Sequence, residues 1–167
     1  YIKYIMSNDL RQGFIFGLNS GVITTAGLIS GLVQTNVSKI IIMISVISLA
    51  ISDSVSEGYG LFLSKKAEDI KDFSNGPYYA LISLLLTKFF VVMSFLIPML
   101  FTNNIKIYKN LSWVIGWGLL LIIILDINLS ILRNESFIYY FIPHIFILFF
   151  VIFLSKYIGN LVNHYTK

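Results

Sequence analysis

The chain has 167 residues, of which 57% are hydrophobic and 12% are charged, and its formal net charge is +4. Soluble domains carry about 25% charged residues, so this composition excludes an ordinary soluble domain and indicates an integral membrane protein. Positive charge is expected in the short loops between membrane helices, and the sequence shows no basic face or module typical of nucleic-acid binding. The chain has no cysteine, which excludes disulfides and thiolate metal sites.

Five apolar segments are long enough to cross a bilayer as helices, which takes about 20 mainly apolar residues each. They are residues 13–34, 39–64, 77–101, 111–132 and 137–159. We therefore predict an all-α protein with five transmembrane helices, forming a single domain over residues 1–167. Lysines and arginines are divided almost evenly between the two ends of such a bundle, so the charge pattern does not orient it in the membrane.

Glycines recur at four-residue intervals in the first segment. They stand at Gly13, Gly17 and Gly21, and again at Gly27 and Gly31. Small residues at this spacing let helix backbones approach closely in lipid. We expect most of them to serve helix packing.

Two carboxylates lie one helical turn apart in the second segment, at Asp53 and Glu57. Ionisable residues at bilayer depth are costly and mark candidate functional sites. Residues at i and i+4 share one helix face, so these carboxylates repel each other unless a proton or a cation is bound. Asn19, Ser20 and Thr24 supply further oxygens in the middle of the first segment. These five residues form the predicted site for a hard or borderline divalent cation.

The second segment also carries a stripe of serines, and its charged continuation over residues 65–72 is expected to extend the helix into water. The serines are Ser45, Ser48, Ser52 and Ser56. Pro77 suits the first turn of the third helix. Pro98 and Pro143 lie inside spans, where they are expected to kink or loosen the helix.

Lys88 lies deep in the third segment and requires an anionic partner. Asp53 or Glu57 is one choice, and Asp126 in the fourth segment is another. An ion pair to one carboxylate is compatible with a cation site, because one lysine cannot neutralise two carboxylates. His144 has no Glu or His at ligand spacing, so we expect it to pack or to lie at the interface.

Residues 11–31, with Asn19-Ser20-Gly21 and the glycine series, resemble the first helix of the vacuolar iron transporter family. Residues 50–68 resemble the second helix of that family, whose pattern is Ala-Asp-x-x-Ser-Met-Gly-x-Gly. The resemblance implies a five-helix homodimer whose first two helices line a divalent-metal path. It also implies proton-coupled export of Fe²⁺ or Mn²⁺ from the cytoplasm into a storage compartment or out of the cell.

The sequence departs from the family pattern in three ways. Ser20 stands where the family has Asp, and Glu57 stands where it has Met. The long cytoplasmic metal-binding helices of some members are replaced by about a dozen residues. The first two changes move one carboxylate from the first helix to the second, and the loss of sulfur weakens the preference for Fe²⁺ over harder cations.

Two classes of function remain at this point. The first is a transporter whose partners are a divalent cation, protons, the bilayer and a second copy of the chain, without a prosthetic group. The second is a non-transporting membrane scaffold or degenerate homologue, in which Asp53 and Glu57 both bond to protein groups. Enzyme activity is not expected, because no nucleophile–base pair or metal-ligand motif is present.

Overall fold

The computed structural model describes residues 8–35, 37–68, 75–101 and 111–165. Five long helices account for nearly all of them: α2 (Asn8–Gln34), α3 (Lys39–Glu68), α4 (Gly76–Ser94), α7 (Ser112–Arg133) and α8 (Phe137–Tyr165). The short helix α5 (Ile97–Leu100) follows α4. All five long helices are long and apolar enough to cross a membrane. The predicted all-helical fold is confirmed in the described residues, and five helices have the length and hydropathy that the predicted spans require.

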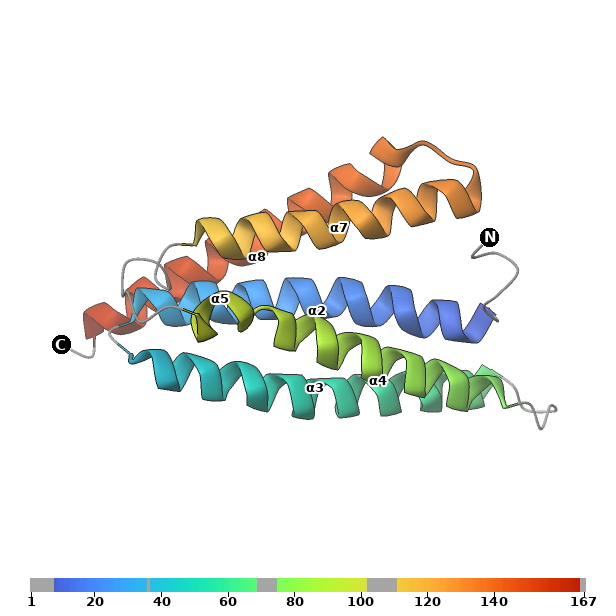
Figure 1. The fold of residues 1–167 in the computed structure, drawn as a ribbon, viewed down its shortest axis with the longest axis horizontal. Helices are drawn as coiled ribbons and strands as arrows, with labels where there is room; N and C mark the ends of the chain where they lie inside the picture. The colour runs from blue at the N-terminus through green and yellow to red at the C-terminus, as the bar shows by residue number, and fades with distance from the viewer. Residues whose placement is uncertain (1–7, 36, 69–74, 102–110, 166–167) are drawn as a thin grey trace.

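Helix α2 is the centre of the bundle. It lies between the pair α3 and α4 on one side and the pair α7 and α8 on the other (Figure 1), and it contacts all four. It is the most buried of the five long helices, and α8 is the least buried. Side chains of α2 can therefore face two separate interhelical spaces.

The glycines of α2 allow its neighbours to pack against its backbone. A Cβ atom added at Gly13 would lie 2.3 Å from the carbonyl oxygen of Ala80, and one added at Gly17 would lie 2.8 Å from that of Leu84. On the other side of α2, a Cβ atom added at Gly159 of α8 would lie 2.2 Å from the carbonyl oxygen of Gly31. The predicted packing role of the glycine series is confirmed at these contacts.

The third predicted span, 77–101, is not one continuous helix. Helix α4 ends at Ser94, and the amides of Phe95 and Leu96 bond to carbonyls three residues back, as in a tight 3₁₀ turn. Pro98 in α5 has no N–H to donate, and in a continuous helix its ring would clash with the carbonyl of residue 94. The proline therefore ends the long helix, a stronger effect than the expected kink.

Helices α3 and α8 continue several residues past the ends of their predicted apolar segments. Helix α3 continues to Glu68, in agreement with the expected extension into water, while residues 69–72 lie outside the described part. Helix α8 runs through Pro143 and past Gly159 to Tyr165. Gly159 does not stop this helix because it is the point of contact with α2.

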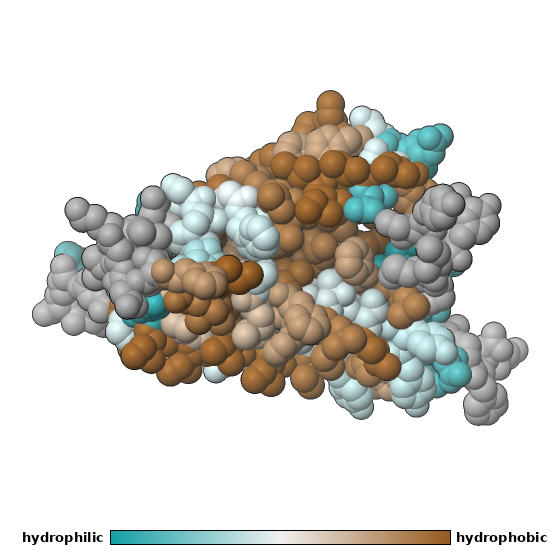
Figure 2. Space-filling model, viewed as in Figure 1, coloured by the Kyte–Doolittle hydropathy of each residue, from teal (hydrophilic) through white to brown (hydrophobic). Residues whose placement is uncertain are grey.

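The outer surface is apolar over the middle of the helices. Figure 2 shows hydrophobic side chains over most of the central region and hydrophilic ones toward both ends. Many large apolar side chains of α3 and α8 are exposed, among them Ile44, Ile51, Phe146 and Phe153. Such a surface is compatible with a protein embedded in a membrane.

Candidate functional site

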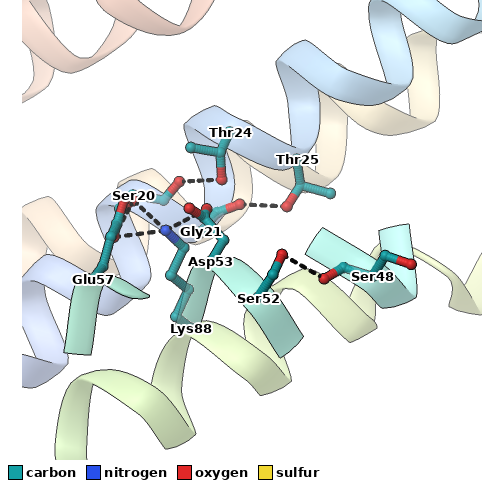
Figure 3. A network of polar contacts seen from close by, with 9 residues as sticks. All are labelled: Ser20, Gly21, Thr24, Thr25, Ser48, Ser52, Asp53, Glu57 and Lys88. Atoms are coloured by element: carbon teal, nitrogen blue, oxygen red, sulfur yellow. Dashed lines mark hydrogen bonds and ion pairs between the residues drawn. The ribbon is translucent and has the colours of Figure 1, made fainter. Parts of the chain in front are cut away.

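Lys88 is the centre of a polar network where α2, α3 and α4 meet (Figure 3). Its side chain is fully buried, and its Nζ lies 2.6 Å from Asp53 Oδ2 and 2.6 Å from Glu57 Oε2. Nζ also donates a hydrogen bond of 2.8 Å to the hydroxyl of Ser20. An ammonium group has three N–H donors, and the network offers three acceptors.

Ser20 joins the first helix of the bundle to the acidic pair. Its hydroxyl lies 2.9 Å from Glu57 Oε1 and 2.8 Å from Oε2, so it donates to the carboxylate while accepting from Lys88. The backbone oxygen of Ser20 accepts a hydrogen bond of 2.9 Å from Thr24 Oγ1. Thr24 thus bonds within its own helix, as threonine in membrane helices usually does.

Glycines of α2 make room for the lysine. A Cβ atom at Gly17 would lie 3.2 Å from the backbone nitrogen of Lys88, and one at Gly21 would lie 3.4 Å from its Cγ. The close approach of α2 and α4 therefore holds the stem of Lys88 against the α2 backbone. Its ammonium group is directed to the α3 carboxylates.

The network carries a formal charge of −1 when both carboxylates and Lys88 are ionised. A buried ammonium without a partner is very costly, so Lys88 requires at least one of the two carboxylates. The side chains of Asp53 and Glu57 are 25% and 27% exposed, whereas that of Lys88 is not exposed at all. The acidic side of the network thus remains open at the surface of the single chain.

The predicted ligand set is only partly brought together. Asp53, Glu57 and Ser20 meet around Lys88, whereas Asn19 faces the other side of α2 and lines a cavity with residues of α7. In the part of the chain that the structure describes, no cluster of three or more His, Asp or Glu side chains forms a ready metal site.

Asp126 does not pair with Lys88, contrary to one of our two alternatives. It is fully buried and lies with its Oδ1 2.6 Å from Nδ1 of His144. His144 therefore has a polar partner inside the bundle, which the expected packing or interfacial role did not include. The sequence held a signal for this pair: Asp126 lies eight residues before Asn134 and His144 lies eight residues after Ser136, so both reach the same depth in a helical hairpin.

A further ion pair lies at the end of the bundle, between Asp9 near the start of α2 and Lys65 near the end of α3. The Asp9 carboxylate also occupies the space beside Gly76 at the start of α4. Sequence analysis did not identify this pair, because its partners are 56 residues apart and lie outside the apolar segments. It ties three helix ends together away from the buried network.

Comparison with known proteins identifies no relative. No protein-family model, curated protein or solved structure matches the chain.

Proposed function

We propose that the protein transports a divalent transition metal, Fe²⁺ or Mn²⁺, across a membrane in exchange for protons. The observation that carries the proposal is the contact of two carboxylates, Asp53 and Glu57, with one buried ammonium group in spanning helices. The carboxylates exceed the lysine by one negative charge. Uncompensated negative charge in a low-dielectric region attracts a cation strongly.

In this proposal the ammonium of Lys88, which is part of the chain, competes with the transported cation for the carboxylates of Asp53 and Glu57. A divalent cation is attracted by each carboxylate about twice as strongly as a monovalent one at the same distance. When it binds Asp53 and Glu57, the ammonium has to move away from them on its flexible four-carbon stem. When the metal leaves, protons and Lys88 compensate the carboxylates again.

The resemblance to the vacuolar iron transporter family supports this reading through one contact. The chain has Ser20 where the family has Asp and Glu57 where the family has Met, and these two side chains are hydrogen-bonded to each other. Because positions 20 and 57 are in contact, moving the carboxylate from the first to the second keeps it in the same site. Oxygen ligands without a thioether suit Mn²⁺ at least as well as Fe²⁺. Export from the cytoplasm, into a storage compartment or out of the cell, is the direction that the resemblance suggests.

A second copy of the chain would complete the site. Ser48, Ser52 and Ser56 are exposed at four-residue spacing on α3, next to the open side of Asp53 and Glu57. A polar stripe facing lipid is unfavourable, and polar and small residues are common at helix–helix contacts in membranes. We therefore include a homodimer that packs through this face of α3.

A scaffold without transport is the second candidate, and one specific observation favours it. Both carboxylates form ion pairs with Lys88, and Glu57 also accepts a hydrogen bond from Ser20, so protein groups compensate most of the network, although the buried Asp53 Oδ2 has no hydrogen-bond partner among the described residues. Such a network specifies the packing of three helices without any ligand. A transport measurement separates the two candidates directly.

The test is uptake of Mn²⁺ into proteoliposomes that hold a pH gradient. We expect Asp53→Asn and Glu57→Gln each to reduce uptake about tenfold or more, because each removes a charged ligand. Asp9→Asn is the matched control, since it removes a carboxylate from a lysine ion pair at the end of the bundle. Wild-type uptake equal to that of empty liposomes would instead support the scaffold, provided that the protein elutes as a folded species in gel filtration.

A further inference from the structure

Helices α7 and α8 carry a buried acid–histidine pair that the transport proposal does not use. The side chain of Asp126 is not exposed at all, and that of His144 is 16% exposed. Asp126 Oδ1 lies 2.6 Å from Nδ1 of His144, a distance at which one of the two atoms carries a proton. The other carboxylate oxygen, Oδ2, is buried and has no hydrogen-bond partner among the described residues. An ionisable pair at this depth in spanning helices marks a candidate functional site.

The unpartnered oxygen indicates where a further proton would bind. A buried carboxylate oxygen without a donor is costly, and so is a buried carboxylate–imidazolium pair, because both charges lose their hydration. A proton on Asp126 Oδ2 removes the charge and turns that oxygen into a donor. The Nδ1–H of a neutral His144 can still donate to Oδ1. The arrangement therefore suits a carboxylic acid beside a neutral imidazole.

A second buried acceptor without a donor lies at a similar depth on α2. Asn19 Oδ1 is buried and has no hydrogen-bond partner among the described residues. Helices α2 and α7 run antiparallel and in contact (Figure 1), and Arg11 and Arg133 line the same end of one cavity. Asn19 lies eight residues from Arg11 and Asp126 lies seven from Arg133, which is about 10–12 Å inward along either helix. Two acceptors at one depth match a proton donor.

The cavity between α2 and α7 gives water a route to this depth. Its volume is about 720 Å³, whereas a water molecule in the liquid occupies about 30 Å³. Asn8, Gln12 and Asn19 supply polar groups to its wall, as water requires. Leu129, one helical turn after Asp126 on α7, is also part of the wall. Water in the cavity would therefore come within about one turn of the pair.

The other ionisable groups of the packed helices on this side of the pair lie toward the end of the bundle. They are Asp9 and Arg11 on α2, Arg133 on α7, Glu135 between α7 and α8, and Tyr140 on α8. Tyr140 is one turn before His144, and its hydroxyl bonds to the carboxylate of Glu135. No other carboxylate, lysine or arginine of the described helices α2, α7 and α8 lies within one helical turn of this depth. A carboxyl group that titrates here is therefore Asp126.

We propose that Asp126 and His144 form a proton-binding site inside the bundle, loaded through the cavity between α2 and α7. Loading forms an O–H bond at Asp126 Oδ2 with a proton taken from water, and unloading returns that proton to water. His144 stays neutral and orients the carboxyl group through its bond to Oδ1 in both states. The site is separate from Asp53 and Glu57, and it does not depend on metal transport.

The site is tested by infrared difference spectroscopy of the full chain in liposomes, between mildly acidic and mildly alkaline buffer. We expect a carboxylic acid C=O band in acid that is lost in alkali. Asp126→Asn should remove this band, whereas Asp53→Asn, the matched control in the other network, should retain it. If Asp126→Asn does not fold, ¹³C labelling of aspartate in Asp53→Asn assigns the band, because Asp126 is then the only aspartate left in the apolar segments. Absence of the band from wild type, or its persistence in Asp126→Asn, would overturn the site.

The loading route is tested by cysteine substitution in the cysteine-free chain. In membranes, Leu129→Cys should react with a small water-soluble methanethiosulfonate, because position 129 lines the cavity. Ile124→Cys is the control, since that side chain is 46% exposed on α7 but is not part of the cavity wall, and so faces lipid. It should react about tenfold more slowly or less, because a thiol in apolar surroundings does not ionise. Equal rates at the two positions, or an unreactive Leu129→Cys, would overturn the route.

Discussion

At the scale of single residues, Lys88 determines what the network can do. Its Nζ donates a hydrogen bond to Ser20 Oγ and forms ion pairs with Asp53 Oδ2 and Glu57 Oε2. The two carboxylates hold more negative charge than this one group cancels. Lys88 therefore stabilises the two carboxylates without a ligand, and in the proposed transporter it would compete with an entering cation.

Lys88→Met should lower the free energy of unfolding by about 3 kcal/mol, because it leaves two carboxylates facing each other without a cation. In the transporter, Mn²⁺ at 100 times its dissociation constant should restore about 2.7 kcal/mol, since the competitor has gone. Thermal unfolding in detergent, with and without Mn²⁺, measures both effects. Lys65→Met is the control, because it breaks a single, partly exposed ion pair and should cost about 1 kcal/mol or less without a response to Mn²⁺. A Lys88→Met protein indifferent to Mn²⁺ would support the scaffold.

At the scale of helices, the site depends on how closely α4 approaches α2. Gly13 and Gly17 bring backbone against backbone, and Lys88 follows on the same face of α4 one turn after Leu84. Backbone atoms cannot rotate away as a flexible side chain can. An added methyl group at these positions must therefore move the whole of α4.

Gly17→Ala should destabilise the protein by about 2 kcal/mol through overpacking, because its Cβ would lie 2.8 Å from the carbonyl oxygen of Leu84. It should also lower Mn²⁺ uptake by displacing Lys88 and loosening its contacts with α3. Gly116→Ala in α7 is the matched control, since nothing lies within 4 Å of its added Cβ and it is outside the proposed contact of α3. Alanine there should be neutral or stabilising by up to about 1 kcal/mol. Thermal unfolding of the two variants side by side checks this, and equal stability would contradict the role given to Gly17.

The sequence allowed the spans to be predicted but not the partners of their charged residues. Each span is determined locally, since a run of about 20 apolar residues suffices to cross the bilayer. Asp53, Glu57 and Asp126 all lie deep enough in their predicted spans to form an ion pair with Lys88. The choice depends on which helices are neighbours: α4 packs along α3, whereas α7 packs on α2 and α8. Which helices pack together is decided by the whole bundle and cannot be read from one segment. The same holds for Asn19 and Ser20, which face different sides of α2.

At the scale of the whole molecule, the two sides of α2 face different spaces. The side toward α3 and α4 holds the acidic network, and the side toward α7 holds a cavity whose lining includes Asn19. The acidic side is open at α3, where Ser52 is exposed. Its hydroxyl donates a hydrogen bond to the backbone carbonyl oxygen of Ser48. Because that hydroxyl makes only a local bond, Ser52 can be replaced without disturbing the bundle.

The absence of cysteine from the chain makes the proposed homodimer directly testable. If two copies pack through α3, Ser52→Cys should form a disulfide-linked dimer on mild oxidation in membranes, because symmetry brings the two positions together at the contact. Phe150→Cys on α8 is the control, since that side chain is 53% exposed on a helix outside the proposed contact, and it should stay monomeric. Non-reducing electrophoresis gives the readout. Cross-linking through Phe150→Cys alone would place the interface at α8. The open side of Asp53 and Glu57 would then face lipid, which is incompatible with a cation site at that position.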